Sequence, residues 1–138
     1  KFELPCGESI LLTDTVGFIR KLPHHLVKAF KSTLDEVTYA DILIIVTDIN
    51  DSEAAEHIKV TKNVIEELGA SDKPIIYVYN KCDLLGDQIP TSEDPNTVIV
   101  SGVTGHGIDR MLELITSEIQ KCKKKYTLLV IHVVKMQF

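Results

Sequence analysis

The most informative stretch of this sequence is Pro74-Ile-Ile-Tyr-Val-Tyr-Asn-Lys-Cys-Asp83. Its apolar part, residues 74–79, predicts a buried strand, and a polar tetrad follows at the carboxyl end of that strand. The carboxylate of Asp83 can accept two parallel hydrogen bonds, from the N1–H and the 2-amino group of guanine. Adenine lacks this pair of donors and would leave the acceptor unpaired. The N-K-x-D spacing therefore favours a guanine-binding loop, in which Asn80 ties neighbouring loops together and the aliphatic stem of Lys81 covers the base.

Two other segments follow candidate strands in the same way. The apolar residues 10–12 precede Asp14-Thr-Val-Gly17, a D-x-x-G pattern that either forms a plain turn or places a carboxylate near Mg²⁺ and a glycine near a γ-phosphate. The run 98–100 leads into Ser101 and Gly102, a small loop that can offer a backbone N–H to the guanine O6. Because open α/β sheets bind ligands at the carboxyl ends of their strands, the three segments together predict a nucleotide site.

The segment Asp14-Thr-Val-Gly-Phe-Ile-Arg-Lys-Leu-Pro-His-His-Leu-Val27 is longer and more specific than D-x-x-G. Together with residues 29–34 it resembles the switch II region of HflX-type GTPases, which are ribosome-associated translational GTPases of the Ras-like P-loop class. The resemblance covers about residues 1–125. It implies binding of GTP and Mg²⁺, hydrolysis of GTP, and contact with the large ribosomal subunit.

The resemblance also implies roles for individual residues, with Asp14 as the metal ligand and no catalytic residue assigned. The binding residues that it implies are Asp14, Gly17, Asn80, Lys81, Asp83, Ser101 and Gly102. Gly102 stands where the family more often has Ala. Phe18 stands where Ras-type proteins have a water-orienting Gln, which implies either that a partner completes the site or that Phe18 packs under the following helix.

The sequence contains no G-x-x-x-x-G-K-[ST] motif, whose backbone N–H groups, lysine and hydroxyl supply most of the phosphate and Mg²⁺ binding. By the resemblance, the P-loop and the first strand and helix would precede residue 1. We therefore expect a truncated G domain that turns over no GTP by itself, from a parent protein that is a GTPase. The alternative is a non-catalytic fragment or interaction module that keeps the fold. A dinucleotide-binding protein would need a Gly-rich fingerprint, which is absent.

Length, charge and composition limit the class of protein to which this chain can belong. A length of 138 residues predicts one domain, and a net charge of −5 argues against broad nucleic-acid affinity. Three cysteines without framework or metal spacing favour free thiols in a reducing cytoplasm. No apolar run is long enough to span a membrane, and no signal peptide opens the sequence. We expect a cytoplasmic protein without membrane contact.

Strands alternate with helices along the sequence, which predicts an α/β fold with three layers and a mainly parallel sheet. The resemblance implies more narrowly a Ras-like P-loop GTPase G domain that lacks its first strand and helix. Expected strands lie within residues 2–14, as half of a hairpin around Cys6-Gly-Glu8, and at 42–48, 75–80 and 97–100. Expected helices span 24–38, the segment from an Asp51 or Ser52 cap to Gly69, and 107–123. Residues 1–125 would form the G domain, and 126–138 the start of a C-terminal segment or an extra strand.

The missing strand raises a physical problem. In the Ras-like topology it lies between the strand that ends at Asp14 and the strand that starts at Ile42. Its removal leaves a gap of roughly 10 Å lined by unpaired backbone groups, which a folded protein rarely tolerates. We therefore expect either direct pairing of the two neighbours or insertion of residues 127–134, from this chain or from a second copy through self-association.

Overall fold

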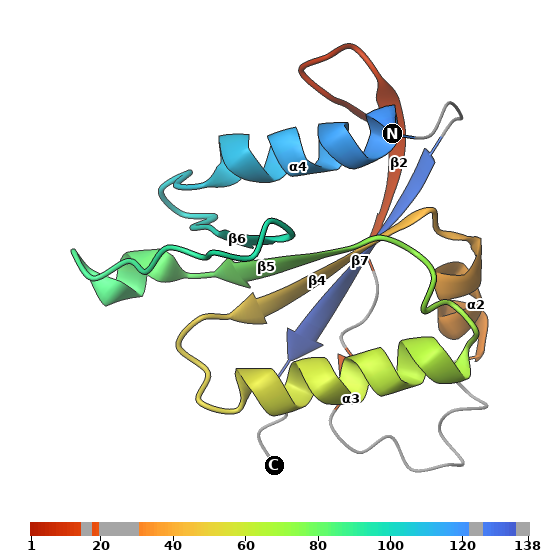
Figure 1. Cartoon of the computed structure of the whole chain (residues 1–138), viewed down its shortest axis with the longest axis horizontal. Coiled ribbons are helices and arrows are strands. Elements are labelled where there is room, and N and C mark those ends of the chain that lie inside the picture. Colours follow the sequence, from red (N-terminus) through yellow and green to blue (C-terminus); the bar gives the residue numbers. More distant parts are fainter. Residues whose placement is uncertain (15–17, 20–30, 122–125, 135–138) are drawn as a thin grey trace.

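The structure, a computed structural model, describes residues 1–14, 18–19, 31–121 and 126–134. It is an α/β arrangement in which helices cover both faces of one sheet (Figure 1). The strands are β1 (Phe2–Glu3), β2 (Ser9–Asp14), β3 (Phe18–Ile19), β4 (Ile42–Asp48), β5 (Ile75–Asn80), β6 (Thr97–Ile99) and β7 (Tyr126–Val134). The helices are α2 (Lys31–Tyr39), α3 (Ala54–Glu67), α4 (Ile108–Gln120) and the short 3₁₀ turn η1 (Cys82–Leu85).

The sheet is mainly parallel, as the alternation of strands and helices predicts. Its strand order is β1-β2-β7-β4-β5-β6, and β3 pairs with β7 off this path. Among the described strands, only β1 and β2 pair antiparallel, as a short hairpin at one edge. The pairs β2–β7, β7–β4, β4–β5, β5–β6 and β3–β7 are all parallel. The α/β class with parallel strands is therefore confirmed.

The central slot of the sheet is filled by β7. In Figure 1 its blue arrow lies between β2 and β4. Val130 is the register partner of Asp14 on β2 and of Ile44 on β4. The prediction that residues 127–134 lie beside both strands is thus confirmed, with the strand supplied by the same chain, and β2 and β4 do not pair directly. The division into a domain of residues 1–125 and a separate C-terminal segment stays a prediction.

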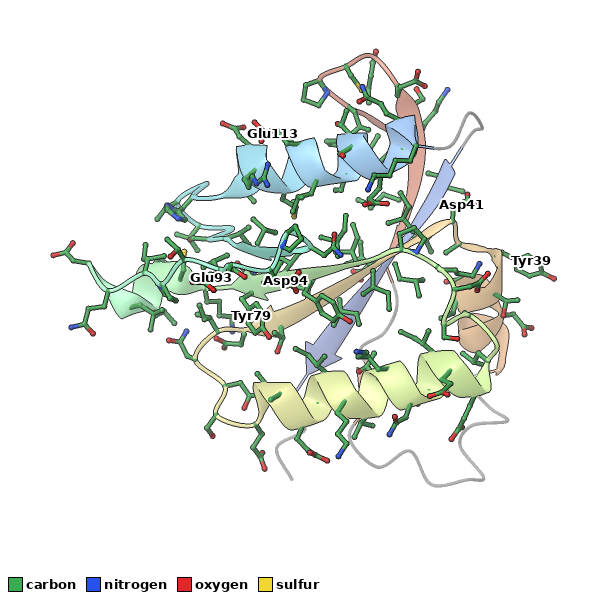
Figure 2. All side chains as sticks on the ribbon, viewed as in Figure 1. Tyr39, Asp41, Tyr79, Glu93, Asp94 and Glu113 are labelled. Atoms are coloured by element: carbon green, nitrogen blue, oxygen red, sulfur yellow. The ribbon has the colours of Figure 1, made fainter. Side chains whose placement is uncertain are left out.

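Strand β4 forms the centre of the core because its apolar residues are buried on both faces of the sheet. Leu43 and Ile45 pack in a cluster with residues of α2 and α3, whereas Ile42 and Ile44 pack in a second cluster with residues of α4. Figure 1 shows the same division, with α4 on one face and α2 and α3 on the other. Glu113, on α4, points away from the sheet (Figure 2).

The sequence predicted the C-terminal end of α3 correctly and its N-terminal cap wrongly. Gly69 has a φ of 71°, and the next residue, Ala70, donates its N–H to the carbonyl of Ile65 at 3.0 Å, so the glycine ends the helix as expected. The expected cap was wrong, because the helix begins one residue after Glu53 and has no side-chain cap bond. Asp51 instead accepts the N–H of Glu53 at 2.9 Å. Of the helix expected at 24–38, residues 24–30 lie outside the described part.

Candidate functional site

Asn80 is the last residue of β5, and its side chain connects two loops. Its Oδ1 accepts the N–H of Lys81 at 2.8 Å and the N–H of Gly102 at 3.1 Å. Gly102 follows β6, the neighbouring strand, whose residues run parallel to β5. Parallel strands end at one edge of a sheet, so the two loops that follow them meet there. The expected tie between the loops is present.

Lys81 occupies the left-handed region with a φ of 67°, which makes it the one non-glycine residue with positive φ in the described ranges. Such a backbone needs support from its surroundings. Its carbonyl accepts a hydrogen bond from Asn50 Nδ2 at 3.2 Å. Its Nζ lies 3.1 Å from Asp48 Oδ2, so the charged end of the side chain is fixed toward the loop after β4.

Asp83 lies in η1 and is half-buried, and a completely buried serine orients its carboxylate. The hydroxyl of Ser101 donates to Asp83 Oδ1 at 2.7 Å and accepts the N–H of Thr104 at 3.1 Å. Within the described ranges, no hydrogen bond engages Asp83 Oδ2. The carboxylate is therefore held in one orientation through one oxygen, with acceptor capacity left on the other.

The loop that carries Ser101 is closed by its own backbone. Ser101 donates its N–H to the carbonyl of His106 at 2.9 Å and accepts the N–H of Gly105 at 2.9 Å. The N–H of Gly102, which the sequence offers to a guanine O6, donates to Asn80 in this structure. A methyl group at position 102 would lie 3.8 Å from Asn80 Oδ1, an ordinary contact distance, so the alanine more common in the resembling family would also fit here.

Of the two residues expected at the phosphate end, Asp14 lies in the described part of the chain and is not in this cluster. Asp14 is the exposed last residue of β2, and β7 and β4 separate β2 from β5. Three strand spacings correspond to roughly 14 Å. Gly17 lies outside the described residues, and of Phe18 only the backbone, at the start of β3, is described. The structure thus brings together Asn80, Lys81, Asp83, Ser101 and Gly102 and leaves Asp14 apart.

The loop after β4 contributes residues that the sequence did not assign to the site. Asp48 Oδ1 accepts the N–H of Asn50 at 2.9 Å and its Nδ2 at 3.0 Å. Burial acts to raise the pKa of the Asp48 carboxyl, but the bonds from Asn50 and the nearby Lys81 outweigh it and hold that pKa below its usual value. These bonds make the segment a tight turn, and no metal-binding cluster occurs among the described residues. The sequence signal that could have identified Asp48 and Asn50 is the polar loop that follows β4, the strand adjacent to β5.

The entry to β6 is also built from side-chain turns. Asp94 Oδ1 accepts the N–H of Asn96 at 3.0 Å, and its Oδ2 accepts the hydroxyl of Thr97 at 2.9 Å. These two bonds hold the pKa of Asp94 below its usual value. Figure 2 labels Glu93 and Asp94 in this segment. The segment leads directly into β6, and Ser101 lies two residues after the last residue of that strand.

Comparison with known proteins shows which sequences this chain resembles. Residues 1–81 match the model of a family described as "50S ribosome-binding GTPase". A GTPase HflX of Caldanaerobacter subterraneus subsp. tengcongensis is 50% identical over 121 residues, which is 88% of this chain and 28% of the relative. A GTPase HflX of Akkermansia muciniphila is 59% identical over 88 residues, 64% of this chain and 20% of the relative. A GTPase HflX of Escherichia coli is 41% identical over 127 residues, 88% of this chain and 30% of the relative.

The similarity is high and extends over most of the chain, but the chain spans less than a third of the length of these relatives. No helix within the described ranges is both long and apolar enough to cross a membrane.

Proposed function

Since the chain belongs to the 50S ribosome-binding GTPase family, with HflX proteins among its relatives, we propose that it forms the guanine-binding part of a GTPase. The site consists of the tetrad after β5 and the loop after β6. In this proposal Asp83 reads the base, Ser101 orients Asp83, and Asn80 holds the two loops at a fixed distance.

The observation that supports this proposal best is the bond from the buried hydroxyl of Ser101 to Asp83 Oδ1, at 2.7 Å. A carboxylate on a flexible loop would lose rotamer entropy whenever it bound a base. Here the carboxylate is already oriented, and its free acceptor capacity suits the paired donors of guanine. Lys81, fixed by Asp48 and Asn50, would border the base on a third side.

The wider activity is a proposal about a longer protein. There, Asp14 and Gly17 would act at Mg²⁺ and the γ-phosphate, GTP would be hydrolysed, and the large ribosomal subunit would be the partner, in the cytoplasm. The 138 residues contain no P-loop motif, so we expect this segment by itself to bind guanine without turning over GTP. Exchange of residues 127–134 between two copies is the form that self-association would take, because this strand has partners on both sides.

The test is base selectivity, measured by titrating the 138-residue chain with guanosine, inosine and adenosine and following backbone amide shifts by NMR. Guanosine should bind at least about fivefold more tightly than adenosine, since a good bidentate contact discriminates by about 1–3 kcal/mol. Inosine lacks the 2-amino group and should fall between them. The shifts should concentrate at Lys81, Asp83 and Gly102.

A chain that binds all three nucleosides equally, or none of them, would contradict the proposal and leave the interaction module as the better description. Shifts confined to residues outside the two loops would contradict it as well.

A further inference from the structure

Strand β7 continues beyond the end of its neighbour β2. Val130 is the partner of Asp14, the last residue of β2, and β7 runs on to Val134. Four further residues in an extended strand correspond to roughly 13 Å. The strand therefore projects well past Asp14 at the edge of the sheet where the base loops lie.

The projecting part of β7 is held on both sides. On one side His132 is the register partner of Val46 on β4. On the other side Val133 and Val134 pair with Phe18 and Ile19 of β3. A ligand that reached from Asp83 to Asp14 would have to cross this paired strand. The base loops and Asp14 are thus separated by an ordered element of the same chain.

A phosphate site needs what this element lacks. Proteins bind phosphate with backbone N–H groups that turn away from a strand, usually through a glycine-rich loop or a helix N-terminus. The segment Ile131-His-Val-Val134 contains no glycine, and as a strand it directs its N–H groups to its neighbours.

The charges near this edge also disfavour phosphate. The ammonium of Lys81 already pairs with Asp48 at 3.1 Å. Asp14 and Asp48 end the two strands that flank β7, and the whole chain has a net charge of −5. Phosphate oxygens placed here would meet carboxylates of the same sign.

We propose that, while β7 occupies the central slot, the site takes guanine as a base or nucleoside and leaves any 5′-phosphates in water. The ligand class of this chain is then a guanine nucleoside rather than a guanine nucleotide. This inference rests on the proposed guanine-binding function and defines the part of the ligand that the site recognises.

The experiment compares guanosine, GMP and GDP, the last also with Mg²⁺, in the NMR titration of the intact 138-residue chain. Adenosine and ADP serve as base controls. The dissociation constants of the three guanine ligands should agree within about threefold, since the phosphates make no contact. Tightening by tenfold or more from guanosine to GDP, with guanine still preferred over adenine, would overturn this inference and leave the proposed function intact. Loss of the guanine preference would overturn both.

Hydrogen exchange supplies a second readout that does not depend on affinity. Amides of residues 131–134 should exchange no faster with saturating GDP than without it, because the ligand leaves β7 in place and binding to the folded chain slows global opening. Faster exchange of these amides on addition of GDP, with those of β5 unchanged, would show that phosphate binding displaces the strand and would contradict the proposal.

Discussion

At the scale of single residues, the site depends on a few polar side chains that each serve two partners. Asn80 bonds two backbone N–H groups, Ser101 connects Asp83 with Thr104, and Asp48 connects Asn50 with Lys81. Removing one such side chain leaves two groups unpaired, so its effect on stability and binding exceeds that of a single hydrogen bond.

Replacing Ser101 with Ala should weaken guanosine binding about tenfold, because a hydrogen bond to a charged group contributes about 1.5–3 kcal/mol and Asp83 loses its orientation. The free energy of unfolding should fall by about 1–2 kcal/mol, since the N–H of Thr104 loses its acceptor. NMR titration and urea unfolding measure the two effects. The control is Ser71→Ala, at an exposed position on a different loop. A folded S101A protein with unchanged guanosine affinity would remove Ser101 from the site.

Replacing Asp48 with Asn should reveal the low pKa of this carboxyl. Its folded-state pKa is below the usual value of 3.8, so the ionised form stabilises the fold above that pH. This stabilisation is lost as the pH falls below 3.8 and through the folded-state pKa. The difference in unfolding free energy between the wild type and D48N should therefore be constant near neutral pH and shrink in acid.

Urea unfolding at a series of pH values measures this difference. The exposed Asp87→Asn serves as the control for removal of a negative charge. A difference that stays the same down to the lowest pH at which the protein folds would contradict the role given to Asp48.

At the scale of elements, the sequence predicted most accurately those strands whose apolar, β-branched runs fit a buried strand and no other element. The strands expected at 42–48 and 75–80 have those bounds in the structure. The start of α3 was predicted wrongly because the pattern of apolar residues does not include His57, a buried polar residue near the start of the helix. That side chain is buried and bonds Asp51 at 2.9 Å through Nδ1, which draws Asp51 into the packing in place of a cap.

Gly107 fixes the start of α4 through its backbone. Its φ is 73°, and a Cβ at this position would lie 2.1 Å from the carbonyl oxygen of Ile99. Gly107→Ala should therefore lower the free energy of unfolding by about 3 kcal/mol or more, the sum of left-handed strain and overpacking. Gly105 has a φ of 83° but open space around it, so Gly105→Ala should cost only about 1–2 kcal/mol. Equal effects of the two substitutions in urea unfolding would contradict this local packing.

At the scale of the whole molecule, the position of β7 followed from counting backbone partners. The gap between β2 and β4 predicted either direct pairing of these strands or insertion of another strand, with residues 127–134 as the best candidate, and the structure shows the insertion. The loop geometry at Lys81 and the contribution of Asp48 and Asn50 could not be predicted in this way. They depend on which loops the completed sheet brings together, and a linear sequence does not display that.

If β7 is the central strand, its amides in residues 128–131 should exchange with solvent as slowly as those of β4, close to the rate set by global unfolding. The rates should not depend on protein concentration, because the strand belongs to the same chain. Rapid exchange of these amides beside a protected β4 would show that the sheet is not completed by β7. Protection that appears only at high concentration would show that a second copy supplies the strand.

The central claim is that Asp83 reads guanine, and exchange of base specificity tests it most directly. In Asp83→Asn the side chain offers one acceptor and one donor, which match the N1–H and the 2-oxygen of xanthine. The account predicts that this variant binds xanthosine more tightly than guanosine, whereas wild type and Asp87→Asn prefer guanosine, all by NMR titration of the 138-residue chain. A folded D83N protein that keeps the wild-type preference for guanosine would contradict the account.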